Sequence, residues 1–202
     1  MVTDAATWAV RSLAGVPPDA WQLPGTTVSW TPRQTLDHII DSLFLHAAYV
    51  ARRAATRISP PRNGDPSAGP EHLRDVLTSA AAVHAHLLEE LPTGVRVFHP
   101  SGLADAEGWI GMACTEVLVH TYDVAAATGI RLEPPVRLAA AVVARVLPWA
   151  YGREDGWARL LWATGRAPLG DRPPAPADWW WQSAPLAQWD GRPRRRTVPP
   201  AW

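Results

Sequence analysis

Apolar residues recur three or four positions apart through most of the chain, and prolines or glycines separate the blocks with this period. The period is that of an α-helix with one buried face. It predicts one short extended piece, at 95–98, and helices over residues 4–13, 32–57, 70–91, 105–128, 134–149 and 155–164. Long helices joined by loops favour an all-α fold, which we interpret as a four-helix bundle with additional helices.

Capping signals mark the ends of several of these helices. Thr3 and Thr31 are predicted N-caps, and Pro32 follows Thr31 at the first helical position, where a missing N–H is harmless. Gly129 is placed to end the fourth predicted helix, because glycine readily adopts the left-handed conformation that closes helices.

The composition changes after residue 165. Residues 168–178 are rich in proline, tryptophans follow at 179–181, and eight of the twelve tryptophans lie from Trp149 onward. We therefore predict a helical domain over residues 1–165 and a Trp- and Pro-rich extension over 166–202. Because adjacent indoles left in water would form a large apolar patch, we expect the extension to pack on the bundle, with a covered strand or small β-hook.

The composition excludes several functions. The 202 residues are 47% apolar, and nineteen basic side chains balance nineteen acidic ones. This balance argues against a nucleic-acid-binding surface, and we expect the arginine-rich run at 192–196 to be a solvated tail. No apolar stretch is long enough to cross a membrane, and no signal peptide is visible. We therefore expect a cytoplasmic protein that binds neither nucleic acid nor membrane.

The chain has one cysteine and no lysine. A single cysteine excludes an internal disulfide, and we expect Cys114 to be a small buried side chain. The absence of lysine excludes Schiff-base chemistry and the lysine of a phosphate-binding P-loop.

The fourth predicted helix is apolar around nearly its whole circumference, which predicts that it is buried. Glu116, His120 and Asp123 are the exception, because they stack on one narrow face at positions i, i+4 and i+7. Side chains at i and i+4 lie about 5–6 Å apart, close enough to share one metal ion. A solvated polar stripe is the alternative, although Trp109 continues the same face with apolar surface.

A third metal ligand has to come from another helix. His38 lies opposite the main apolar stripe of the second predicted helix, whereas His84 lies centrally on the stripe of the third. A hydrogen-bonded core histidine is the simpler account of His84, but periodicity by itself makes the two near-equal candidates.

Three further residues are candidates for the surroundings of such a site. Tyr49 and Trp109 are candidates to line a pocket, with core packing as the simpler account. Arg166 is a candidate contact for a carboxylated substrate or thiol, and the alternative is an ion pair with a local acid.

Three stretches carry a family resemblance. They read W-T-P-x-x-x-L-D-H-I at 30–39, H-P-x-G-x-A-D at 99–105 and M-A-C-T-E-V-L-V-H-T-Y-D-V at 112–124. Together they resemble the metal-binding domain of mycothiol-dependent maleylpyruvate isomerases, which belong to the DinB-like four-helix bundles. The resemblance implies a divalent metal ion, zinc or alternatively nickel, held by His38, Glu116 and His120. It also implies a small-molecule substrate, with mycothiol or a similar low-molecular-weight thiol as cosubstrate.

Two imidazoles and one carboxylate leave a zinc-type ion one open position, as in catalytic sites. A thiol bound there would lose its proton. Asp123 lies one turn beyond His120 and is placed to hold a ligand imidazole by its other N–H; an ordinary exposed acid is the alternative.

Three classes of function stay open from the sequence. We predict a metal-dependent, thiol-using transferase or isomerase. The alternatives are a metal-dependent enzyme that activates water, and a non-catalytic bundle that binds a ligand or partner. The sequence also leaves a homodimer open.

Overall fold

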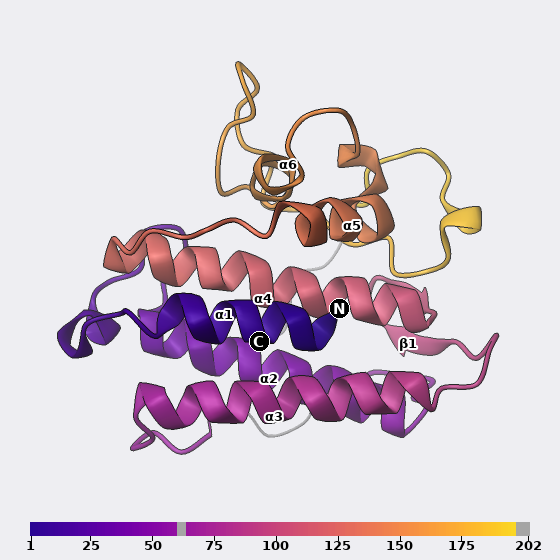
Figure 1. Cartoon of the computed structure of the whole chain (residues 1–202). Helices are drawn as coiled ribbons and strands as arrows, with labels where there is room; N and C mark the ends of the chain where they lie inside the picture. Colours follow the sequence, from indigo (N-terminus) through magenta and orange to yellow (C-terminus); the bar gives the residue numbers. More distant parts are fainter. Residues whose placement is uncertain (60–63, 197–202) are drawn as a thin grey trace.

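The computed structural model describes residues 1–59 and 64–196. Four helices form a bundle in which the first and second each pack against both the third and the fourth (Figure 1). They are α1 (Val2–Leu13), α2 (Pro32–Ala51), α3 (Pro70–Glu89) and α4 (Ala106–Thr128). The predicted all-α four-helix bundle is thereby confirmed.

Two further helices, α5 (Val136–Val146) and α6 (Gly156–Ala163), pack together, and α5 covers the side of α4 that faces away from the bundle (Figure 1). As a result α4 is buried along most of its length, as its apolar circumference predicts. The smaller elements are the antiparallel strands β1 (Val97–His99) and β2 (Gly102–Ala104), and the 3-10 turns η1 (Pro18–Gln22), η2 (Pro148–Ala150) and η3 (Leu186–Gln188).

The predicted caps hold for α2 and α4. Thr31 and Gln34 form a reciprocal capping box at the start of α2. The Asp105 side chain accepts a hydrogen bond from the Gly108 N–H at 2.8 Å, which fixes the start of α4. Gly129 ends α4 in the left-handed conformation, with φ of 73°. Both helices that carry the candidate ligands therefore have well-defined starts.

Several predicted boundaries are wrong. The α1 helix begins at Val2, so Thr3 lies inside it and Met1 takes the N-cap position. The α2 helix ends at Ala51 rather than near residue 57, because Arg53 adopts a positive φ of 45° and the chain turns away. The α5 helix ends at Val146 rather than Trp149, since a proline at 148 lacks the N–H that would continue it.

Residues 179–196 of the C-terminal extension form a small hook that packs against the helices. Trp179 and Arg195 form an antiparallel bridge, and the Trp180 N–H donates to the Arg194 carbonyl at 3.0 Å. The Gln182 N–H anchors the hook to the end of α5 by donating to the Val146 carbonyl at 2.8 Å. A domain boundary between residues 165 and 166 stays a prediction.

The expectation of a solvated arginine-rich tail is wrong for Arg194 and Arg196, which are only partly exposed, whereas Arg195 is exposed as expected. The Arg194 side chain donates to Gln182 Oε1 at 2.8 Å, and Arg195 pairs with Asp178. The Arg196 guanidinium lies over the Trp180 ring, 5.1 Å from its centroid. Arg194 and Arg196 are therefore held against the hook by these contacts. No helix in the part of the chain described here is long and apolar enough to cross a membrane.

Candidate metal centre

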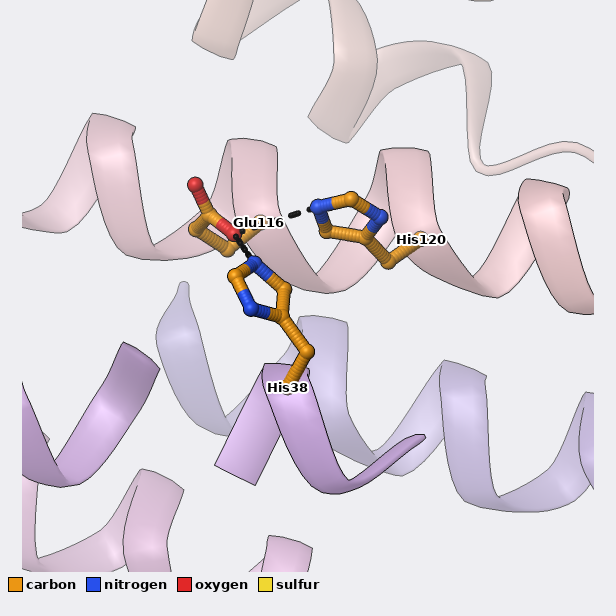
Figure 2. Close-up of side chains that lie close together, drawn as sticks. All are labelled: His38, Glu116 and His120. Atoms are coloured by element: carbon orange, nitrogen blue, oxygen red, sulfur yellow. Dashed lines mark hydrogen bonds and ion pairs between the residues drawn. The ribbon is translucent and has the colours of Figure 1, made fainter. Parts of the chain in front are cut away.

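Three side chains from two helices converge where α2 crosses α4 (Figure 2). Glu116 and His120 project from successive turns of α4, and His38 reaches them from α2. Glu116 Oε2 lies 3.1 Å from His38 Nε2 and 3.3 Å from His120 Nε2. One ligand atom from each residue lies within 4.8 Å of the others, and Glu116 and His120 are buried. The structure thus brings together the three predicted ligands.

These distances fit a metal ion. Ligand atoms bonded at 2.0–2.2 Å to a tetrahedral ion stand roughly 3.4 Å from one another. The separations of 3.1 and 3.3 Å around Glu116 Oε2 are close to that value before any adjustment by an ion. Two imidazole nitrogens and one carboxylate oxygen are also ligands that borderline divalent ions accept. The cluster can therefore hold a divalent metal ion.

A second carboxylate, that of Asp123, orients the His120 ring by bonding to its Nδ1. His120 Nδ1 lies 2.8 Å from Asp123 Oδ2, so the other ring nitrogen, Nε2, faces Glu116. Asp123 is only 2% exposed, which contradicts the alternative of an ordinary exposed acid. It also accepts hydrogen bonds from Arg166, at 2.9 and 3.2 Å, and from the Thr27 hydroxyl at 2.5 Å. The orientation of His120 is therefore fixed by a carboxylate that is itself held on both oxygens.

The electrostatics of the cluster favour a positive charge between the carboxylates. Burial works to raise the pKa of Glu116, but hydrogen bonds to His120 and His38 hold it well below its usual range. Burial works to lower the pKa of His120, yet hydrogen bonds to Asp123 and Glu116 raise it to about 9. Asp123 is also buried, but His120 and Arg166 lower its pKa to about 2. A bound cation would supply the positive charge that a proton otherwise supplies.

A cavity of about 290 Å³ opens onto this cluster. Its lining includes His38, Glu116 and His120 together with the indoles of Trp30 and of residues 179–181. Trp30 lies against the His38 ring, with 4.5 Å between the ring centroids. The cluster is therefore accessible to a small molecule through a cavity whose lining includes four indole side chains.

The ion pair expected as one alternative for Arg166 is present, whereas its role as a substrate contact stays a prediction. Arg166 lines the cavity, so it is placed to meet a ligand there. It also forms an ion pair with Asp123, at 2.9 Å, and donates to the Thr164 carbonyl at 2.7 Å. Most of its donors are thereby committed to holding Asp123 and the chain after α6.

Tyr49 and Trp109 are not among the residues that line this cavity. Their rings stack on each other inside the bundle, with centroids 5.6 Å apart. His84 is fully buried in the same region, where its ring lies 5.8 Å from that of His46, which contacts Trp109. Core packing, the simpler account of Tyr49 and Trp109, therefore agrees with the structure. His84 is a core histidine as expected, but in the described part of the chain neither of its ring nitrogens has a hydrogen-bond partner, so the expected hydrogen bond is not found. Cys114 is also fully buried, and burial raises the pKa of its thiol to about 12, as expected for an inert side chain.

The residues at the cavity that were not found from the sequence include three from irregular segments. Thr27 and Trp30 lie in the loop before α2, and Arg196 lies in the C-terminal hook. None of them belongs to a helical period, so no pattern of apolar positions marks them. Trp30 had one local signal, because it opens the W-T-P stretch that precedes α2.

The chain is similar to known proteins over most of its length. Two uncharacterized proteins from Mycobacterium tuberculosis, one from strain CDC 1551 / Oshkosh and one from strain ATCC 25618 / H37Rv, are each 30% identical to it over 170 residues. The match covers 82% of this chain and 82% of each relative. No solved structure matches the chain significantly. The family model of the DinB superfamily matches residues 3–124, which span the bundle and all three converging ligands, and the chain therefore belongs to the DinB superfamily.

Proposed function

We propose that the protein is a metal-dependent enzyme that uses a low-molecular-weight thiol, mycothiol or a similar compound, to transfer or isomerise a small molecule. The ion would be zinc, with nickel as the alternative, and its ligands would be His38, Glu116 and His120. One observation carries the proposal: three protein donors meet at a cavity that a small molecule can enter. Three protein donors and an accessible fourth position are typical of catalytic rather than structural sites.

A divalent ion at this position would lower the pKa of a thiol and hold it as a thiolate at neutral pH. The surrounding side chains would offset charge, orient a ligand imidazole and exclude water. Glu116 would offset one of the two positive charges, while Asp123 and Arg166 would keep Nε2 of His120 aimed at the ion. Trp30 and the indoles of the hook would exclude water from the cavity.

The described lining of the cavity offers no evident nucleophile of its own. Cys114 is buried elsewhere, with a raised pKa. The hydroxyl of Thr27 donates to Asp123 at 2.5 Å, and that of Thr115 donates to the Gly111 carbonyl at 2.8 Å. A nucleophile would therefore come from outside, which supports the thiol that the 112–124 resemblance implies.

The remaining elements of the proposal follow from composition and resemblance. The partners would be a small-molecule substrate and the thiol, with neither nucleic acid nor membrane involved. The protein would act in the cytoplasm, and a homodimer stays open.

Cobalt-substituted protein provides the test. Titration with mycothiol should produce an intense sulfur-to-metal charge-transfer band in the near ultraviolet, because the thiolate would bind cobalt directly. Glu116→Ala should abolish the band, whereas Glu107→Ala, on the first turn of the same helix and exposed, should keep it. If cobalt is bound and no band appears at millimolar mycothiol, the thiol proposal fails and the water-activating or non-catalytic alternative takes its place.

A further inference from the structure

The hook contributes a cation to the cavity that lacks a carboxylate partner in the described structure. Arg194 lies 3.4 Å from Asp190, and Arg195 is paired with Asp178. Arg196 instead lines the cavity, and across residues 1–59 and 64–196 its guanidinium has no carboxylate within 4.0 Å. Within the described residues its side chain donates a hydrogen bond from Nη2 to the Ala177 carbonyl at 3.0 Å. Adjacent arginines therefore have different environments, and of these three only Arg196 lines the cavity.

The surroundings of Arg196 are those of a partly desolvated cation. The guanidinium lies over the Trp180 ring, 5.1 Å from the centroid. Burial and the charge of Arg166 lower the pKa of Arg196, while the charges of Glu116 and Asp178 work in the opposite direction. A cation removed from water without a charged partner is unfavourable, and a bound anion would relieve that cost.

The charges around the cavity indicate how much negative charge a ligand would bring. Asp123 and Arg166 offset each other in their ion pair. Glu116 offsets half the charge of a divalent ion, and one thiolate would offset the other half. The charge of Arg196 would then remain. A ligand assembly with one further negative charge would complete the balance.

We propose that Arg196 is the anion-binding residue of this cavity, and that the molecule on which the site acts carries a carboxylate on a flat or apolar body. The inference rests on the proposed function and names its substrate class. A single remaining positive charge suits a monoanion, and the two-pronged geometry of a guanidinium matches a carboxylate. The indoles of Trp30 and residues 179–181 supply flat apolar surface for the rest of the molecule.

Thiols that also carry a carboxylate test this inference in cobalt-substituted protein. The probes are 3-mercaptopropionate and 4-mercaptobutyrate, each compared with the alcohol of the same length, 3-mercapto-1-propanol and 4-mercapto-1-butanol. Dissociation constants come from the charge-transfer band. At least one carboxylate should bind roughly tenfold or more tightly than its alcohol, because a charge-assisted hydrogen bond forms to Arg196.

The matched variants are Arg196→Gln and Arg195→Gln. Each removes one positive charge from the hook, but only Arg196 lines the cavity. Arg196→Gln should abolish the carboxylate preference and leave alcohol binding unchanged, which also shows that the hook is intact. Arg195→Gln should keep the preference. A preference that survives Arg196→Gln would mean that the carboxylate chelates the metal or meets another cation, and either result overturns the inference.

A second pair of probes separates this inference from the thiol proposal. In zinc-loaded protein, 3-phenylpropionate should bind more tightly than 3-phenyl-1-propanol by calorimetry, and Arg196→Gln should again remove the difference. These probes contain no sulfur, so they test Arg196 even if no thiol gives a band. If wild-type protein binds acid and alcohol equally in both series, the assignment of Arg196 is wrong whatever the fate of the thiol proposal.

Discussion

Two groups of histidines lie in the same helical bundle, and they differ in the acids beside them. In the metal cluster, His38 and His120 each face Glu116, and His120 also bonds to Asp123. In the core group, His46 lies within ring-contact distance of His84, His99 and Trp109, with centroids 5.0–6.1 Å apart. Among residues 1–59 and 64–196, no carboxylate lies within 4.0 Å of the ring nitrogens of these histidines. The neighbouring carboxylates, and not the number of imidazoles, therefore make one group a candidate ion site.

The two groups also differ in the charge that they favour. Burial works against a charged imidazole in both, but in the metal cluster the acids outweigh it and raise the pKa of His120 to about 9. In the core group burial prevails and lowers the pKa of His84 to about 4 and that of His99 to about 3. The core histidines are therefore neutral at pH 7, and the rings of His46 and His99 pack beside Trp109.

The largest expected effect separates the two groups by metal content. His38→Ala should lose the ion on dialysis, because two remaining protein ligands hold a divalent ion weakly. His84→Leu should keep one ion per chain, since His84 lies in the other group. Elemental analysis of protein prepared without chelator or affinity tag measures both. An ion retained by His38→Ala and lost by His84→Leu would reverse our assignment of the two groups.

His38 and His84 also mark the limit of what the sequence could predict about the ligands. Periodicity placed Glu116, His120 and Asp123 on one face of α4, because a single helix fixes the relative positions of its own side chains. It could not choose between His38 and His84, because which faces of α2 and α4 meet depends on packing between helices. The family resemblance selected His38, and the structure places that residue beside Glu116.

The surroundings of the site were harder to predict than the ligands. Thr27, Trp30 and Arg196 reach the cavity from irregular segments that lie far from α4 in the sequence. The tryptophans at 179–181 indicated a covered surface but not which one they would cover. Their position depends on contacts such as the bond from Gln182 to the end of α5, which no local pattern encodes.

The next effect concerns acid stability and arises from the core group. The pKa of His84 falls from 6.5 to about 4 on folding, so the unfolded chain binds the extra proton first as pH drops. Stability should therefore fall between pH 6.5 and about 4, by about 3 kcal/mol for a shift of this size. His84→Leu should remove this contribution, because it deletes the titrating group. Urea unfolding of metal-free protein, compared between the two proteins at each pH, measures the difference. A difference that does not change with pH would show that His84 is not held neutral.

The smallest expected effect concerns Asp123, which acts on the metal through His120. Asp123→Asn should weaken metal binding by roughly 10–100-fold, the usual cost of losing a carboxylate behind a ligand imidazole. The physical reason is the tautomer: an aspartate accepts the Nδ1 proton and leaves Nε2 free to bind, whereas an amide can donate to Nδ1 and move the proton to Nε2. Arg166 would also lose its ion pair in this variant.

Asp178→Asn is the matched control, because it alters a carboxylate that pairs with Arg195 in the hook. Zinc affinity measured by competition with a chromogenic chelator should be unchanged in that variant. Arg166→Gln adds a further distinction, since it removes the ion pair but leaves the Asp123 carboxylate facing His120. Its affinity should lie between those of wild type and Asp123→Asn. If Arg166→Gln were as weak as Asp123→Asn, the ion pair and not the tautomer of His120 would govern the site.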